Sequence, residues 1–177
     1  MTSFKFDIST LPYPSLSRMH EPGQKPSRDR VLQTCLEISS NAASVVQSTL
    51  GAPGFGLLGI VTTAAEYTAL TGAAFLRPGN PGAAPANCVR AWQEQWAQYH
   101  LMLQVETALR NQLLQAADDI YWRPLFQPVT GFGRRTALDF LTHIKAHYAA
   151  FDESVRANTL STMNNGWSGE PFKIPIA

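Results

Sequence analysis

One long amphipathic stretch, between residues 89 and 113, constrains the fold more than any other part of the sequence. Apolar side chains recur there every three or four residues, at Val89, Trp92, Trp96, Tyr99, Met102, Val105, Leu109 and Leu113. That spacing is typical of one face of an α-helix of about seven turns. We therefore predict an all-α domain whose largest hydrophobic cluster centres on Trp92, Trp96, Leu109, Leu141 and Ile144.

Local start signals predict further helices on both sides of this stretch. Capping-box spacing, in which a threonine and an acid three residues later satisfy each other's backbone donors, occurs at Thr63 with Glu66 and at Thr136 with Asp139. Ser27 can cap an earlier helix, whose expected buried face is Val31, Cys35, Ile38, Ala42 and Val45. The helix after Thr136 is expected to bury Leu138, Leu141, Ile144 and Tyr148. Asp118 and Asp152 can cap shorter helices over 120–126 and 152–163.

Prolines and glycines mark the segments between the helices. Residues 1–27 contain four prolines and show no lasting period, so they predict an extended N-terminal arm with one short strand near Phe4–Ile8. The Gly- and Pro-rich segments Gly51–Gly56 and Arg77–Gly82 interrupt the helical pattern and predict loops. We expect a single helical domain over residues 28–167 and a tail over 168–177.

The charge content narrows the classes of function. Of the 177 residues, 15% are charged and 45% are hydrophobic, and the net charge is +1. Few charges over a large surface favour association between molecules over mutual repulsion. The balance of charges argues against a dedicated nucleic-acid-binding protein, which would show a basic stripe.

Compartment and membrane signals are also informative. The first residues lack the apolar run of a signal peptide. The uncharged stretch 38–65 contains Pro53 and four glycines, which excludes a membrane-spanning helix there. Cys35 and Cys88 are too few and too far apart for a disulfide framework or a zinc site, so we expect reduced thiols. The expectation is a cytoplasmic, non-secreted protein with no membrane partner.

Two polar clusters are candidates for chemistry. Asp139, His143 and His147 share one helix face, and histidines four residues apart can chelate a metal, but no clear further ligand is present. A polar surface is therefore the favoured interpretation of that face. Arg134 and Arg135 form a basic pair that can contact phosphate or RNA, with a solvated loop as the favoured alternative.

Sequence motifs of catalysis give no support for an enzyme. The segment Gly54–Gly59 matches a dinucleotide-binding pattern, but a predicted helix rather than a strand precedes it, so we interpret it as a turn. The chain contains no P-loop, nucleophile elbow or paired-carboxylate motif. We expect neither a cofactor nor a catalytic residue.

A set of ordered landmarks extends over residues 48–167. The segment LGIVTTAAEYTALTGAAF, at 58–75, runs directly into LRPGNPG at 76–82. Later, PVTGFG at 128–133 precedes TALDFLTH at 136–143, followed by Tyr148, Asn158, Met163 and Trp167. In order and spacing these landmarks resemble the capsid region of Gag polyproteins from copia-type LTR retrotransposons.

This resemblance implies the N-terminal lobe of a Gag capsid, a helical structural protein that self-associates into a shell around element RNA. Loops and helix ends commonly join such lobes, so the self-association candidates are Gly54, Phe55, Arg77, Pro78, Asn80 and Pro81. Many Gags continue into a second lobe and a zinc knuckle, so we expect either a fragment or a shortened Gag-like copy, with RNA as an indirect partner. Two alternatives stay open: a Gag-derived domain that binds a host protein, and a small metal-dependent enzyme using Asp139, His143 and His147.

Overall fold

The computed structural model describes residues 6–45, 50–84, 87, 89–149 and 161. Its helices are α1 (Arg28–Ser44), α2 (Ala64–Thr71), α3 (Val89–Ala116), α4 (Asp119–Trp122) and α5 (Ala137–Ile144). Short 3-10 helices lie at Ile8–Thr10, Leu58–Ile60 and Arg123–Leu125, and a π-helical turn at Lys145–Ala149 extends α5. The described residues form no strand and only one isolated bridge, between Gln127 and Gly131. The prediction of an all-α fold is confirmed.

Both predicted capping boxes form. The Thr63 side chain accepts a hydrogen bond from the Glu66 N–H, and the Glu66 carboxylate accepts one from the Thr63 N–H over 2.9 Å. Thr136 and Asp139 repeat this arrangement at the start of α5, where the return bond is 2.8 Å long. α2 ends as predicted at Gly72, whose φ of 71° lies in the left-handed region that glycine adopts without steric cost.

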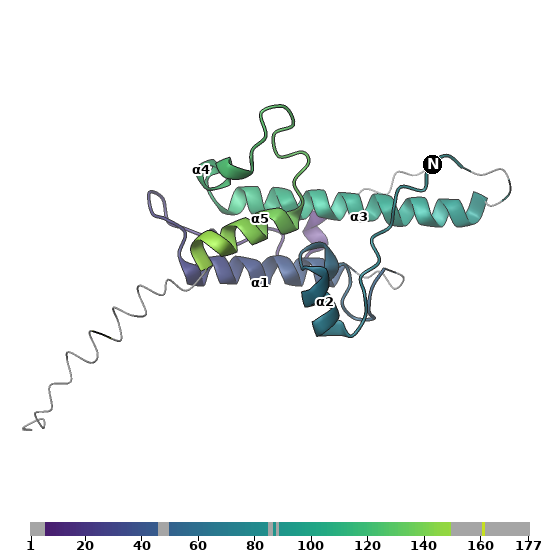
Figure 1. Cartoon of the computed structure of the whole chain (residues 1–177), viewed down its shortest axis with the longest axis horizontal. Coiled ribbons are helices and arrows are strands. Elements are labelled where there is room, and N and C mark those ends of the chain that lie inside the picture. Colours follow the sequence, from purple (N-terminus) through teal and green to yellow (C-terminus); the bar gives the residue numbers. More distant parts are fainter. Residues whose placement is uncertain (1–5, 46–49, 85–86, 88, 150–160, 162–177) are drawn as a thin grey trace, which may run out of the picture.

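The core lies where α1 and α5 pack against the second half of α3 (Figure 1). Of the predicted apolar face, Val31, Cys35, Ile38 and Ala42 are buried on α1, whereas Val45 follows the end of the helix and is half-buried. α5 contributes Ala137, Phe140, Leu141 and Ile144. Phe140 was not on the predicted face, and Leu138 is only half-buried, so the buried side of α5 is rotated relative to the prediction.

The N-terminal arm is part of this core, which the sequence did not predict. Leu11, Leu16 and Met19 are buried although the segment has no regular period. The Met19 N–H donates to the carbonyl oxygen of Ala116 over 2.9 Å, which ties the arm to the end of α3. The strand prediction is wrong over its described part, because Ile8 begins a 3-10 helix. Phe4 and Lys5 lie outside the described residues.

Trp92 and Trp96 do not belong to the core, so this part of the prediction is wrong. Trp96 is 37% exposed, whereas Leu109 is fully buried. At about 100° per residue, Trp96 and Leu109 lie roughly 140° apart around the helix axis. The apolar stripe with this spacing therefore winds around α3, so its first residues and its last residues face different sides of the helix. α1 and α5 pack only against the side that contains the last residues.

Several predictions concern residues that the structure does not describe. These are the helix over 152–163, of which only Ser161 is described, the tail over 168–177, and the positions Cys88, Asn158, Met163 and Trp167. Among the described helices, none combines the length and the apolar character needed to cross a membrane.

Candidate functional site

The first half of α3 stands away from the helical core. α3 has 28 residues, which at 1.5 Å per residue makes it about 42 Å long. Its buried residues begin at Met102, and none from Val89 to Leu101 is buried. In Figure 1 this half runs on beyond the end of α1.

Aromatic rings line the projecting half. The ring centroids of Trp92 and Trp96 are 6.0 Å apart, and those of Trp96 and His100 are 3.6 Å apart. Tyr99 meets the His100 ring edge-on with centroids 5.5 Å apart. Side chains four residues apart lie one above the other on a helix, so these rings form a ladder along its surface. Aromatic groups with exposed apolar area are typical of protein–protein contacts.

The Pro- and Gly-rich loop predicted over 77–82 lies along a flank of α3. Arg77 forms an ion pair with Glu106 at 3.2 Å, and further along the loop the Gly82 carbonyl oxygen accepts a hydrogen bond from the Trp92 indole over 3.1 Å. The Asn80 side chain accepts from the Gly82 N–H over 2.9 Å and closes a turn. Arg77 and Asn80 are exposed, while Pro78 and Pro81 are half-buried.

The other predicted contact segment joins the start of this loop. The Leu76 N–H donates to the Leu50 carbonyl oxygen over 2.8 Å, so residues 50–59 and the Pro- and Gly-rich loop are neighbours. The Phe75 ring lies against Gly59 and Gly51. Gly54 is exposed and Phe55 is half-buried on the turn between α1 and α2. The six self-association candidates therefore lie in two segments that are held to each other.

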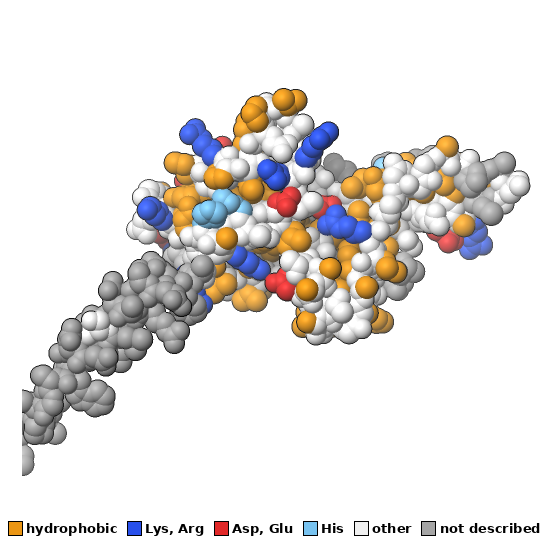
Figure 2. Space-filling view, in the orientation of Figure 1, with side chains coloured by type: hydrophobic (Ala, Val, Ile, Leu, Met, Phe, Trp, Pro, Cys, Tyr) orange, Lys and Arg blue, Asp and Glu red, His pale blue; other side chains and the backbone are white. Residues whose placement is uncertain are grey.

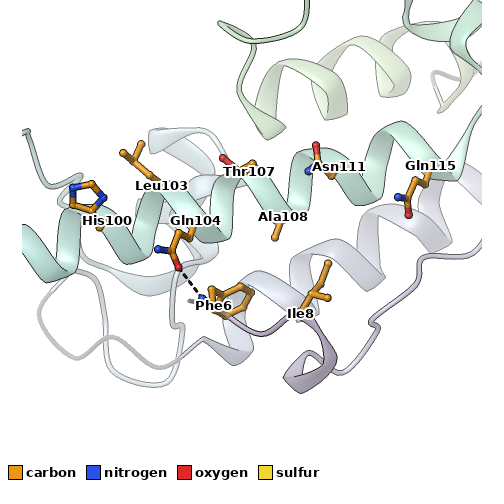
Figure 3. A pocket seen from close by; sticks show the side chains of 9 residues that line it. All are labelled: Phe6, Ile8, His100, Leu103, Gln104, Thr107, Ala108, Asn111 and Gln115. Carbon is orange, nitrogen blue, oxygen red and sulfur yellow. Dashed lines mark hydrogen bonds between the residues drawn. The ribbon is translucent and has the colours of Figure 1, made fainter. Parts of the chain in front are cut away.

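A groove runs beside α3, between this helix and the N-terminal arm (Figure 3). Its volume is about 490 Å³, and Phe6 and Ile8 form its arm side. The Phe6 N–H donates to the Gln104 side chain over 2.7 Å and fixes the arm at that edge. The α3 side is formed by His100, Leu103, Gln104, Thr107, Ala108, Asn111 and Gln115. An apolar floor with uncharged amides at its edges suits a polypeptide segment better than a charged small molecule.

The Asp139–His143–His147 face is used internally. Asp139 is half-buried and its carboxylate serves the α5 capping box. His143 Nε2 lies 3.0 Å from the Tyr121 carbonyl oxygen, and the His143 and His147 rings are tilted by 42° to each other with centroids 4.3 Å apart. Burial lowers the pKa of His143, and the neighbouring His147 adds to this effect, although the bond to Tyr121 opposes it. The described residues contain no group of three or more His, Cys, Asp or Glu side chains that could hold a metal ion.

The predicted basic pair lies near the end of the segment 126–136, which connects the short helix after α4 to α5 and projects as a loop (Figure 1). Arg135 Nε donates to the Leu125 carbonyl oxygen over 3.1 Å, so this guanidinium holds the two sides of the loop together. Arg134 is exposed and is the member of the pair that can meet phosphate. The tip residue Val129 is 95% exposed, and Figure 2 shows an apolar tip with basic side chains on either side.

Sequence reasoning missed the groove and the outward position of the aromatic ladder. The groove depends on Phe6 and Ile8, which lie in a segment without periodicity and carry no signal of their own. The spacing of the ladder matches one face of a helix, and for that reason it predicts buried side chains. Placing each residue at about 100° around the helix axis would have separated Trp96 from Leu109.

The chain was also compared with known proteins. The sequence matches no protein-family model and no curated protein, and the fold matches no solved structure. The residues and the geometry of the chain itself are therefore the basis for its function.

Proposed function

We propose that this chain is a structural, capsid-like module, similar to the N-terminal lobe of a copia-type Gag, that self-associates and has no enzymatic role. The observation that carries the proposal is the projecting half of α3, where Val89 is 48% and Trp96 is 37% exposed and nothing is buried before Met102. Large apolar side chains in water add nothing to the stability of a single molecule. A neighbouring copy that covers them gains the free energy of apolar burial.

The charges of this region also support association. Between Val89 and Leu101 the charged residues are Arg90 and Glu94, which pair with each other at 3.3 Å. Two copies can therefore approach along this half of α3 without net repulsion. The low charge of the whole chain, 15% of residues, acts in the same direction.

The expected contact is individually weak. Shells are held by many small interfaces, so a single contact of roughly 800 Å² or less, with a dissociation constant of about 10⁻⁴ M, is sufficient. Because the surface is largely apolar and carries no net charge, added salt should strengthen association slightly. A charge-driven contact would instead weaken as salt screens it.

Analytical ultracentrifugation tests the proposal directly. Sedimentation of the purified chain between about 10 μM and 1 mM, at low and at high salt, should show mass that rises with concentration. Electron microscopy of the concentrated sample should then show rings, sheets or shells. A strict monomer at millimolar concentration in both salts would remove the self-association function.

In this proposal the assembled shell encloses RNA in the cytoplasm, and direct contact with RNA is limited. The Arg135 guanidinium is occupied by its hydrogen bond to the Leu125 carbonyl oxygen. Of the predicted basic pair, this leaves Arg134 as the candidate for contact with RNA. Assembled fractions should therefore carry nucleic acid, seen as a raised ratio of absorbance at 260 nm to 280 nm. Isolated monomer should bind RNA weakly and with a shallow dependence on salt.

A second candidate function is a binding domain of the same ancestry, and the groove favours it. Its apolar floor and amide edges fit an amphipathic helix or an extended peptide from a partner protein. In this case the chain should stay monomeric while fluorescent amphipathic peptides bind. Ala108→Trp, which fills the groove, should abolish binding, whereas Ala91→Trp at an exposed position of α3 should not.

A small metal-dependent enzyme is the weakest candidate, because the Asp139 carboxylate is occupied by the capping box. Metal analysis of the purified chain separates this function from the other two. Stoichiometric zinc that is lost in the His143→Ala, His147→Ala double variant would support it. We expect no such loss, and unchanged folding in the double variant.

A further inference from the structure

One stripe of side chains runs along the projecting half of α3 and ends just after Met102, and its spacing is the same when read from either end. It consists of Val89, Trp92, Trp96, His100 and Leu103, with intervals of three, four, four and three residues. At about 100° per residue all five lie within about 80° of one another around the helix axis. Residue types mirror as well as positions, with an aliphatic side chain at each end and an aromatic ring at each inner position.

This symmetry has a specific consequence for pairing. When two copies of a helix cross antiparallel about a twofold axis at Trp96, each Trp92 faces a His100 and each Val89 faces a Leu103. An isologous contact requires a surface that is complementary to itself in this way. We infer that the stripe is the docking surface for the same stripe of a second copy, with the two α3 helices antiparallel and Trp96 on the axis. The inference rests on the self-association proposed above.

The surroundings of the stripe agree with a second copy as the occupant. The buried residues of α3, from Met102 onward, lie on the opposite side of the helix, and of the aliphatic and tryptophan side chains in the stripe only Leu103 also packs against the core. The charged residues of the projecting half, Arg90 and Glu94, lie on another side of the helix and pair with each other at 3.3 Å. A strongly charged partner would find no complementary charge here.

The antiparallel direction also separates the two molecular bodies. Each body is built on the second half of its α3, so the two bodies lie at opposite ends of the paired helices. The groove edge formed by His100 and Leu103 then receives the start of the partner's α3. On the flank of the stripe, the bond from Trp92 to the Gly82 carbonyl oxygen keeps that indole fixed before the partner arrives, which lowers the entropic cost of association.

A charge placed on the axis tests the surface. Trp96→Glu should weaken self-association by about 30-fold or more, because a buried aromatic anchor is replaced by two facing carboxylates. The matched control is Gln95→Glu, which adds the same charge at an exposed position on another side of α3. Circular dichroism should show the same helix content in both variants, so that a loss of association is not a loss of folding.

Cysteine pairing tests the direction. In a background with Cys88→Ser, the remaining Cys35 is buried and its thiol pKa is raised, so it reacts slowly. Under mild oxidation, Val89→Cys protein mixed with Leu103→Cys protein should form a mixed disulfide dimer, and neither should form a dimer alone. Dimers of each single variant with itself would indicate parallel helices and overturn the inference.

Different results would overturn the docking surface and the self-association. Association that persists in Trp96→Glu, without a mixed Val89→Cys and Leu103→Cys product, would overturn the stripe as the contact and leave self-association through another surface. A wild-type chain that stays monomeric at millimolar concentration would overturn the proposed function and this inference together. Three results together support both the docking surface and the proposed function. Association is lost in Trp96→Glu, it is kept in Gln95→Glu, and the mixed disulfide forms.

Discussion

The side-chain amide of Asn41 donates a hydrogen bond to the amide oxygen of Gln112 over 3.0 Å, with both side chains buried between α1 and α3. The Tyr13 carbonyl oxygen accepts from both amides, over 2.7 and 2.9 Å, and the Tyr13 N–H donates to Asn41 over 2.8 Å. The pair therefore joins two helices and also fixes the N-terminal arm. A buried polar network of this kind stabilises one arrangement because each partner depends on the others.

Removing one member should be costly. Asn41→Ala leaves the Gln112 oxygen and the Tyr13 N–H without their buried partner, and should lower the free energy of unfolding by about 2–3 kcal/mol. Urea denaturation measures this change. The control is Ser40→Ala, at an exposed position of the same helix, where we expect a change within about 0.5 kcal/mol. Equal stability of the two variants would contradict the role of the network.

The two kinds of tryptophan should respond differently to truncation. Trp122 is fully buried against Phe140, so Trp122→Ala should cost about 3–5 kcal/mol. Trp96 is partly exposed and outside the core, so Trp96→Ala should cost less than about 1 kcal/mol in the monomer. Thermal unfolding of dilute protein compares them. A large loss in Trp96→Ala at a concentration where the chain is monomeric would place Trp96 in the core after all.

Gly59 is needed because the Phe75 ring occupies the space that a Cβ would take. Gly59→Ala should push this ring, and the loop it anchors, out of place and cost about 1–3 kcal/mol. Gly79→Ala is the matched control, since a Cβ there meets nothing within 4 Å. If both alanines are tolerated equally in chemical denaturation, Phe75 does not hold the loop to residues 50–59.

Glu37 should make stability depend on acid pH. Burial alone would raise its pKa, but hydrogen bonds from the Ser17 hydroxyl, the Ser17 N–H and Gln33 outweigh burial and hold the pKa below its ordinary value. The folded state thus favours the charged carboxylate. Its stabilising contribution is complete above the ordinary pKa of about 4.3 and is lost as pH falls through the lowered pKa.

The measurement for this prediction is urea unfolding at a series of pH values from 7 down to 3. Glu37→Gln, which cannot titrate, should be less stable at neutral pH and should lose less stability than wild type across the acid range. A parallel fall in both proteins would show that other carboxylates account for the acid sensitivity.

Local signals predicted much of this fold. The Thr63 and Thr136 capping boxes form because each needs only residues within one helical turn, so tertiary packing does not decide them. The end of α2 at Gly72 follows from backbone geometry alone. The extent of α3 was predicted because sustained spacing over many turns leaves no alternative to a helix.

Features that depend on the third dimension were not predicted. Periodicity identified Trp92 and Trp96 as an apolar side of α3. It could not show that this side is left uncovered by α1 and α5. Leu11, Leu16 and Met19 are buried by irregular backbone, which has no period to detect. Of the predicted site residues, Arg135 and Asp139 turned out to be occupied by internal hydrogen bonds, and such bonds come from packing that spacing does not encode.

The division of α3 at Met102 also has a consequence for how copies of this chain diverge. Substitutions of the buried residues from Met102 onward, such as Leu109 and Leu113, weaken the fold itself. If copies associate through the projecting half as proposed, substitutions of its exposed residues would leave the fold intact and change which copies recognise one another. Related copies would then drift apart in partner choice first, while the architecture stays the same.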